Sequence, residues 1–294
     1  GMGAASCRVV TLAMVRDRFE GKEMAKVMSL IMMMFIMVPA IAPAVGQGIL
    51  LFSGWRSIFI FLFIYGIVAM IWMNFRQDET LSDQNRIPLS IANIIAGCKE
   101  TLFNPISRNY MFAGGIMFGA FIGYLTSAQQ ILQVQYDLGK LFPVYFGVLA
   151  LAIGFASFLN SKLVMKFPME KLCIAALGVI CLLSLAFYGL NLISQDNPSL
   201  WFLMAYFIGM FFCFGILFGN FNALAVQPLG HIAGIANSVI STVQTLISVV
   251  IGSYIGQTYD GTVLPLTLGF LACAICTYII VVRIYKNGIE KQVV

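Results

Sequence analysis

The stretch 200–225 reads LWFLMAYFIGMFFCFGILFGNFNALA and contains no charged residue. A helix of about 20 apolar residues crosses the roughly 30 Å hydrocarbon core of a bilayer, so this stretch predicts a membrane-spanning helix. The same argument predicts seven further spans, because strands of a membrane barrel would alternate apolar and polar residues instead. These spans lie at 27–51, 55–75, 109–134, 142–161, 172–193, 233–256 and 262–284. The predicted fold class is therefore an all-α polytopic membrane protein.

The composition of the whole chain agrees with this interpretation. Of its 294 residues 60% are hydrophobic and only 10% are charged, against about 25% charged residues in soluble domains, and the mean hydropathy is +0.93. The net charge of +5 is too dispersed to form a surface that follows nucleic-acid phosphates. The seven cysteines show no metal-ligand spacing around the single histidine, His231, so we expect no metal, no cofactor and no enzymatic activity.

The positions of the basic residues predict an orientation. Fourteen of the 17 Lys and Arg residues fall at 16–26, 76–108, 162–171 and 283–291, whereas Arg56 and Lys140 lie on the opposite side and Arg8 lies within an apolar run. Because cytoplasmic loops carry the excess of Lys and Arg, we expect the C-terminus and segment 76–108 to be cytoplasmic.

One long polar segment divides the chain. We expect residues 1–75 to be the rest of an N-terminal half, 76–107 a cytoplasmic linker, and 108–294 a C-terminal half with six spans, as in one half of a twelve-span carrier. Within the linker, apolar residues recur at helical spacing after Pro88, which favours a short amphipathic helix at the membrane surface over an irregular connection. These apolar residues are Ile91, Ile94, Ile95, Cys98 and Leu102. Residues 1–15 are too short to span, and position 1 is not Met, so we expect an upstream part to be missing.

Several short motifs then support a family resemblance. The motifs are GMGAA at 1–5, VRD at 15–17, MSL at 28–30, APAVG at 42–46, GWR at 54–56 and QPLGHIAG at 227–234. Together they resemble the Bcr/CflA drug-resistance group of the major facilitator superfamily. The resemblance implies a major facilitator fold that lacks roughly the first three and a half of its twelve helices.

The resemblance also implies an antiporter-type kink in the family's fifth span. The corresponding residues are Pro39, Pro43, Gly46, Gln47 and Gly48, and the sequence departs from the family's glycine-rich pattern at Ala42 and Gln47. Proline bends a helix because it lacks a backbone N–H, and small residues allow close helix approach.

Polar residues inside the spans are the candidate substrate pathway, because polar groups in lipid should face protein or water. Thr126, Gln129, Gln130 and Gln133 have the spacing of one helix face, as do Asn237, Ser241, Gln244 and Ser248. The side chains of each row either form hydrogen bonds between helices or line the substrate pathway. We favour the pathway role, and Gln244 is the best single candidate for it. The full set of predicted pathway residues is Arg8, Tyr124, Thr126, Gln129, Gln133, Asn220, Asn237, Ser241 and Gln244. Glycines at four-residue spacing, Gly115, Gly119 and Gly123 with Gly252 and Gly256, predict close helix packing.

None of the 12 carboxylates falls inside a predicted span. The resemblance implies proton-coupled drug efflux by alternating access, with the coupling acid in the family's first span, so we expect this chain alone not to couple transport to protons. The implied partners are a drug-like or metabolite substrate, protons and the lipid bilayer of a bacterial inner membrane. A metabolite or sugar exporter of the same fold, and a non-transporting membrane subunit, remain open alternatives. A membrane redox enzyme would need buried His, Cys or carboxylate clusters, which the sequence does not offer.

Overall fold

The computed structural model describes residues 10–11, 14, 18, 38, 42–78, 90–193 and 198–293, with side chains as far as residue 286. The chain divides into two compact units, Gly1–Ser90 and Ile91–Val294. Each unit is described by itself below.

Two continuous helical stretches of the first unit are described along their length, the helix Ala42–Phe52 and helix α3, Arg56–Arg76. The predicted span at 55–75 is thereby confirmed within one residue. At the start of α3, the guanidinium carbon of Arg56 lies 4.6 Å from the centre of the Trp55 ring. Within the described residues no side chain of α3 is buried, and a helix that is apolar on all sides is typical of a membrane span.

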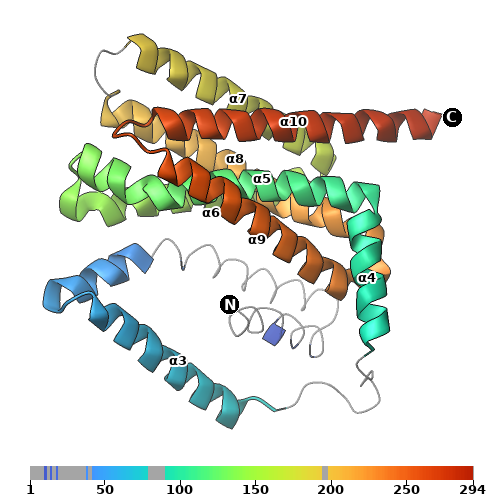
Figure 1. Cartoon of the computed structure of the whole chain (residues 1–294), viewed down its shortest axis with the longest axis horizontal. Helices are drawn as coiled ribbons and strands as arrows, with labels where there is room; N and C mark the ends of the chain where they lie inside the picture. Colours follow the sequence, from blue (N-terminus) through green and yellow to red (C-terminus); the bar gives the residue numbers. More distant parts are fainter. Residues whose placement is uncertain are drawn as a thin grey trace. The chain divides into compact units, whose positions relative to one another are not determined.

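The second unit is a helix bundle whose successive long helices run in opposite directions, with a short helix, α4, at one end (Figure 1). Asn104 separates α4 from α5 and caps α5, because its side-chain oxygen accepts hydrogen bonds from the backbone N–H groups of Ile106 and Ser107 at 3.1 and 3.0 Å. The helices are α4 (Ile91–Phe103), α5 (Pro105–Ala128), α6 (Phe142–Leu163), α7 (Met169–Ile193), α8 (Leu200–Val226), α9 (Ala233–Gln257) and α10 (Leu264–Val293). Short helical turns connect them: the π-helix η2 (Gln129–Gln135), and the 3₁₀ turns η3 (Gly139–Leu141) and η4 (Gln227–Ile232).

The most extensive helix contact is the one between α5 and α9; α7 packs against α10 and α6 against α8. A methyl group added at Gly119 would lie 2.7 Å from the Cβ atom of Ile251, and one at Gly123 would lie 2.9 Å from the Cβ atom of Ile255. The predicted glycine packing is therefore confirmed: the glycines of α5 receive the isoleucines of α9, and the helix backbones approach closely as a result.

The core of the second unit is aromatic. Phe121 of α5 makes edge-to-face contacts with Phe211, Phe214 and Phe218 of α8, with ring centres 5.7–6.0 Å apart. Such pairs add about 0.5–1.5 kcal/mol each beyond the area that they bury. The apolar stretch at 200–225 is thus both a membrane span and the central helix of this core.

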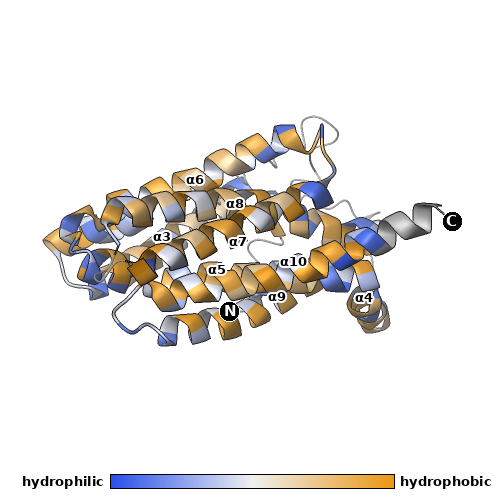
Figure 2. Ribbon diagram, turned by 90° about the horizontal axis from the view of Figure 1, so that it is seen from above, coloured by the Kyte–Doolittle hydropathy of each residue, from blue (hydrophilic) through white to orange (hydrophobic). Residues whose placement is uncertain are grey.

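Six helical stretches among the described residues are long and apolar enough to cross a membrane. One of them, Leu200–Gln257, contains both α8 and α9, which are separated by non-helical dihedral angles at Leu229. Hydrophobic residues predominate along the helices, and hydrophilic residues gather toward their ends (Figure 2). The predicted all-α polytopic class is confirmed; most of the predicted span at 27–51 lies outside the described residues.

Basic residues of the second unit gather at the end that carries α4. Among the described Lys and Arg side chains of this unit, Lys140 alone lies at the opposite end, within η3. The basic residues at the α4 end lie on α4, at the start of α5, around the α6–α7 connection and late in α10: Lys99, Arg108, Lys162, Lys166, Lys171, Arg283 and Lys286.

Candidate functional site

The polar row on α9 lies against α5 and α8. Asn237 and Ser241 are half-buried. The side-chain amide of Asn222 on α8 donates to the side-chain oxygen of Asn237 at 3.4 Å, and the Asn237 amide donates to the backbone oxygen of Ala233 at 3.0 Å. Ser248 is buried, and its hydroxyl donates to the backbone oxygen of Thr245. The row therefore combines helix contacts at its two ends with a half-buried middle.

Gln244 occupies that middle, halfway along α9, and its side chain is half-buried. The amide lies over Gly114 of α5, where a Cβ atom would come 3.1 Å from the Gln244 Cδ atom and closer still to its nitrogen. Among the described residues this amide has no hydrogen-bond partner. An amide that is partly accessible and unpaired at mid-span can bind a polar group of a ligand.

The predicted polar row of Thr126, Gln129, Gln130 and Gln133 crosses a change of helix geometry, because the helix becomes a π-helix at Gln129. Thr126 precedes the change and packs against α9, with its hydroxyl 3.0 Å from the backbone oxygen of Gly123 and 3.5 Å from that of Gly252. Gln129 is exposed and Gln133 half-buried. Gln130 is also exposed, whereas the intervening residues 127, 128, 131 and 132 are buried. The four polar residues therefore share the less buried side of the helix, and their lining of the pathway stays a prediction.

Tyr124 lies in the aromatic core and is fully buried. Its ring centre lies 4.7 Å from that of Phe211 and 5.3 Å from that of Phe207, both in edge-to-face geometry. Within the described residues the Tyr124 hydroxyl is buried without a hydrogen-bond partner. The sequence predicts this residue at the pathway, whereas the structure buries it in the aromatic core, among phenylalanines.

Asn220 makes a reciprocal amide pair that the sequence did not predict. Its amide donates to the side-chain oxygen of Asn160 on α6, and the amide of Asn160 donates back, both at 3.0 Å. Asn220 is 2% exposed and Asn160 9% exposed. The pair satisfies both amides within the bundle and joins α6 to α8, so Asn220 has a helix-packing role in this structure.

The end of the bundle away from α4 is held by two tyrosines. The Tyr136 hydroxyl donates to the backbone oxygen of Pro198 at 2.7 Å, and the Tyr259 hydroxyl donates to the side-chain oxygen of Gln135 at 3.2 Å. Burial raises the pKa of Tyr136 to about 12, and burial together with the neighbouring Asp260 raises the pKa of Tyr259. Both hydroxyls therefore remain donors at neutral pH.

Two of the predicted site residues, Arg8 and Pro39, lie outside the described residues. Pro43, Gly46, Gln47 and Gly48 lie on the helix Ala42–Phe52, which is continuous through all four. The turn that Pro43 would bend includes residues outside the described part, so the kink stays a prediction.

Residues 1–253 match the Major Facilitator Superfamily. A bicyclomycin resistance protein homolog of Haemophilus influenzae is 29% identical over 277 residues, which are 94% of this chain and 69% of that protein. A multidrug resistance protein of Shewanella oneidensis is 26% identical, with 84% of this chain and 61% of that protein covered. A chloramphenicol resistance protein of Pseudomonas aeruginosa is 27% identical, with 85% of this chain and 58% of that protein covered. The chain thus spans less than two thirds of the length of the last two relatives.

Proposed function

The chain belongs to the major facilitator superfamily, and from this premise we propose that it takes part in the export of drug-like small molecules by alternating access. The names of the bicyclomycin, multidrug and chloramphenicol resistance relatives support a drug-like substrate class. The sequence motifs at 1–60 and 227–234 point to the same group.

The observation that carries the proposal is the environment of Gln244. Its side chain is half-buried at the middle of α9, its amide is unpaired among the described residues, and the amide lies over the glycine surface of α5. Pockets that accept varied small molecules are mainly apolar with few polar anchors. We therefore propose Gln244 as a polar anchor of the substrate pathway, with Ser241 and Asn237 as its neighbours one and two turns away.

The distribution of basic residues supports an orientation. Because Lys and Arg accumulate in cytoplasmic loops, the end of the second unit that carries α4 is proposed to face the cytoplasm, together with the C-terminus. The relatives are bacterial, so the membrane is proposed to be the bacterial inner membrane.

Proton coupling is proposed on the resemblance alone. Among the described spans of the second unit the single acidic residue is Glu170, in the first turn of α7, and a coupled proton needs a titratable group within the membrane. In the related group the coupling acid belongs to the first span. Arg8, in an apolar run, is proposed to face a partner or a cavity, because a buried cation at mid-bilayer costs about 2.5–3.5 kcal/mol on insertion scales.

The test is a panel of unrelated drugs, including bicyclomycin and chloramphenicol, on bacteria that lack their own exporters and carry the complete gene. We expect protection against several drugs, and loss of protection with Gln244→Ala. The matched control is Thr242→Ala on the same helix, because the exposed Thr242 hydroxyl donates to the backbone oxygen of Ser238 within its own helix. Thr242→Ala should protect as well as the wild type.

The alternatives give different results in the same cells. Excretion of a single metabolite without protection against drugs would identify a metabolite exporter. A protein that inserts into the membrane but neither protects against drugs nor excretes a metabolite would be identified as a non-transporting subunit. Equal loss of protection in the Gln244→Ala and Thr242→Ala variants would contradict the role of Gln244.

A further inference from the structure

Three phenylalanine rings form a triangle at the edge of the aromatic core. The ring centres of Phe118 and Phe121 on α5 lie 6.0 Å apart, and that of Phe218 on α8 lies 5.6 and 5.7 Å from them in edge-to-face geometry. All three side chains are half-buried, whereas Phe211 and Phe214, which contact Phe121 from α8, are buried. The triangle is therefore the accessible part of the core.

The triangle lies on the face of α5 between α8 and α9. Gly114 marks this face, because a Cβ atom there would meet the Gln244 amide of α9 and would lie 3.6 Å from the Cβ atom of Phe221 on α8. Phe118 follows Gly114 by one turn on α5, and Phe218 precedes Phe221 by one turn on α8. The two helices run in opposite directions (Figure 1), so the rings lie about 5–6 Å along the helix axes from the Gln244 amide, on the side away from α4.

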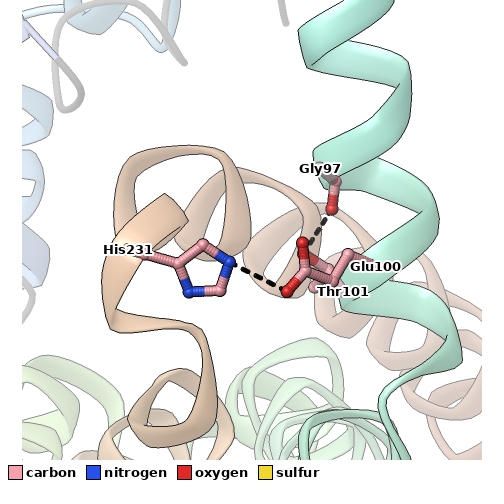
Figure 3. A network of polar contacts seen from close by, with 4 residues as sticks. All are labelled: Gly97, Glu100, Thr101 and His231. Carbon is pink, nitrogen blue, oxygen red and sulfur yellow. Dashed lines mark hydrogen bonds and ion pairs between the residues drawn. The ribbon is translucent and has the colours of Figure 1, made fainter.

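The α4 end of this face is closed. Ser107 lies on the same face of α5, three turns before Phe118 and about 20° around the axis from it, and its side chain is fully buried. At this end α4 packs against α9, and a carboxylate oxygen of Glu100 on α4 lies 2.9 Å from the Nε2 atom of His231, in the η4 turn between α8 and α9 (Figure 3). The accessible part of the face therefore consists of the Gln244 amide and, beyond it, the rings.

The surroundings of the triangle carry no charge that could balance a cation. The described Lys and Arg side chains of the second unit lie toward its two ends. The single acidic residue in its described spans, Glu170, lies in the first turn of α7. Ring faces attract cations, but a buried cation without a counter-charge is costly. The triangle therefore favours an uncharged ligand.

The geometry of the rings favours an aromatic ligand. Aromatic rings prefer edge-to-face or offset-stacked neighbours with centres about 4.5–7 Å apart, and the half-buried triangle can offer both arrangements to a fourth ring. One turn away, the unpaired Gln244 amide can donate or accept a hydrogen bond.

We propose that Phe118, Phe121 and Phe218 form an aromatic subsite of the substrate pathway, which takes the ring of an uncharged aromatic compound while the Gln244 amide binds a polar group of the same compound. This inference rests on the proposed export function only in placing the subsite on the pathway. It adds the substrate class, and it assigns the choice of that class to the three rings.

The test is equilibrium dialysis of three compounds with the purified product of the complete gene in one detergent. The first is chloramphenicol, an uncharged compound with a phenyl ring and hydrogen-bonding groups. The second is its analogue in which the phenyl ring is saturated to cyclohexyl, and the third is ethidium, an aromatic cation. We expect chloramphenicol to bind roughly 2- to 12-fold more tightly than the cyclohexyl analogue, and ethidium to bind more weakly than chloramphenicol.

The variants are judged by the ratio of the two uncharged affinities. Phe118→Leu and Phe218→Leu should each at least halve this ratio, and Phe118→Tyr, which keeps the ring, should preserve it. The matched control is Phe112→Leu, because Phe112 is exposed on the same helix about 120° around the axis from Phe118. Gln244→Ala should weaken both compounds equally and leave the ratio unchanged, since the amide does not distinguish the rings.

Four outcomes would overturn the aromatic subsite: no binding of chloramphenicol, a wild-type ratio near one, a ratio that both leucine variants preserve, or an equal loss in Phe112→Leu. Ethidium binding that is as tight as that of chloramphenicol and falls in the same variants would overturn the uncharged class. A melting temperature for each variant excludes unfolding as the cause of any loss.

Drug protection in cells separates this inference from the export function. Protection against several drugs, together with an unchanged ratio in the leucine variants, would overturn the subsite and leave export standing. A ratio that depends on the rings, in a protein that protects against no drug, would support the subsite and contradict export.

Discussion

Replacing Gly119 by alanine tests the packing of α5 against α9. The added methyl carbon would lie 2.7 Å from the Cβ atom of Ile251, 2.9 Å from its Cγ2 atom and 3.3 Å from the Cα atom of Ser248. Carbon atoms in contact prefer about 3.5–4.0 Å. A rotamer change of Ile251 cannot move its Cβ atom, so α5 and α9 must separate by roughly 1 Å at this point.

The expected cost combines two opposing terms. Overpacking a well-packed interface costs about 1–3 kcal/mol, while removing a glycine from a helix interior returns about 0.5–1 kcal/mol. The net destabilisation is therefore about 1–2 kcal/mol. For a domain of this size, this lowers the melting temperature by roughly 2–8 °C.

The assay is the melting temperature of the purified full chain in one detergent, followed by its intrinsic fluorescence. The matched control is Gly178→Ala on α7, where an added Cβ atom has nothing among the described residues within 4 Å, so its melting temperature should stay the same or rise. In an Ile251→Gly background the opposing Cβ atom is absent, and Gly119→Ala should then no longer destabilise. A Gly119→Ala protein that melts with the Gly178→Ala control would refute the reasoning.

Three further predictions address the other polar contacts. Gly114→Ala should reduce drug protection as Gln244→Ala does, with little change in melting temperature, because the methyl displaces only the flexible end of the Gln244 side chain; protection at the wild-type level would contradict the anchor. Asn160→Leu should destabilise by about 1–3 kcal/mol, because it leaves the buried Asn220 amide unpaired, and adding Asn220→Leu should recover part of the lost melting temperature. Tyr136→Phe should cost about 1 kcal/mol at neutral pH. The raised pKa of Tyr136 means that its hydroxyl hydrogen bond stabilises the folded protein fully below pH 10.0 and is lost as the pH rises through about 12. The difference in melting temperature between the wild type and Tyr136→Phe should therefore vanish over that range.

The membrane spans follow closely from the sequence, because the thickness of a bilayer sets their length. The predicted span at 233–256 is helix α9, Ala233–Gln257, and the predicted span at 200–225 is helix α8, Leu200–Val226. The sequence also predicts that α5 and α9 each pack closely against another helix, since both carry glycines at four-residue spacing.

The candidate site was less predictable, because its contacts join residues far apart in the chain. The partner of Asn220 is 60 positions away, and no local pattern marks Asn160 as that partner. The spacing of the row that begins at Thr126 does not reveal that the helix becomes a π-helix at Gln129, although the row residues remain exposed or half-buried. The burial of Tyr124 depends on phenylalanines of α8, which a single helix pattern does not reveal.

The reciprocal amide pair also constrains the order in which the bundle is assembled during synthesis. Asn160 is translated 60 residues before Asn220, so at about 5–20 residues per second it is without its partner for roughly 3–12 s. Asn160 lies in the last turn of α6, where an amide can stay hydrated among the headgroups until α8 enters the membrane. Closure of α6 onto α8 must then follow the insertion of α8, and the nascent chain keeps a water-accessible amide at this end until that step is complete.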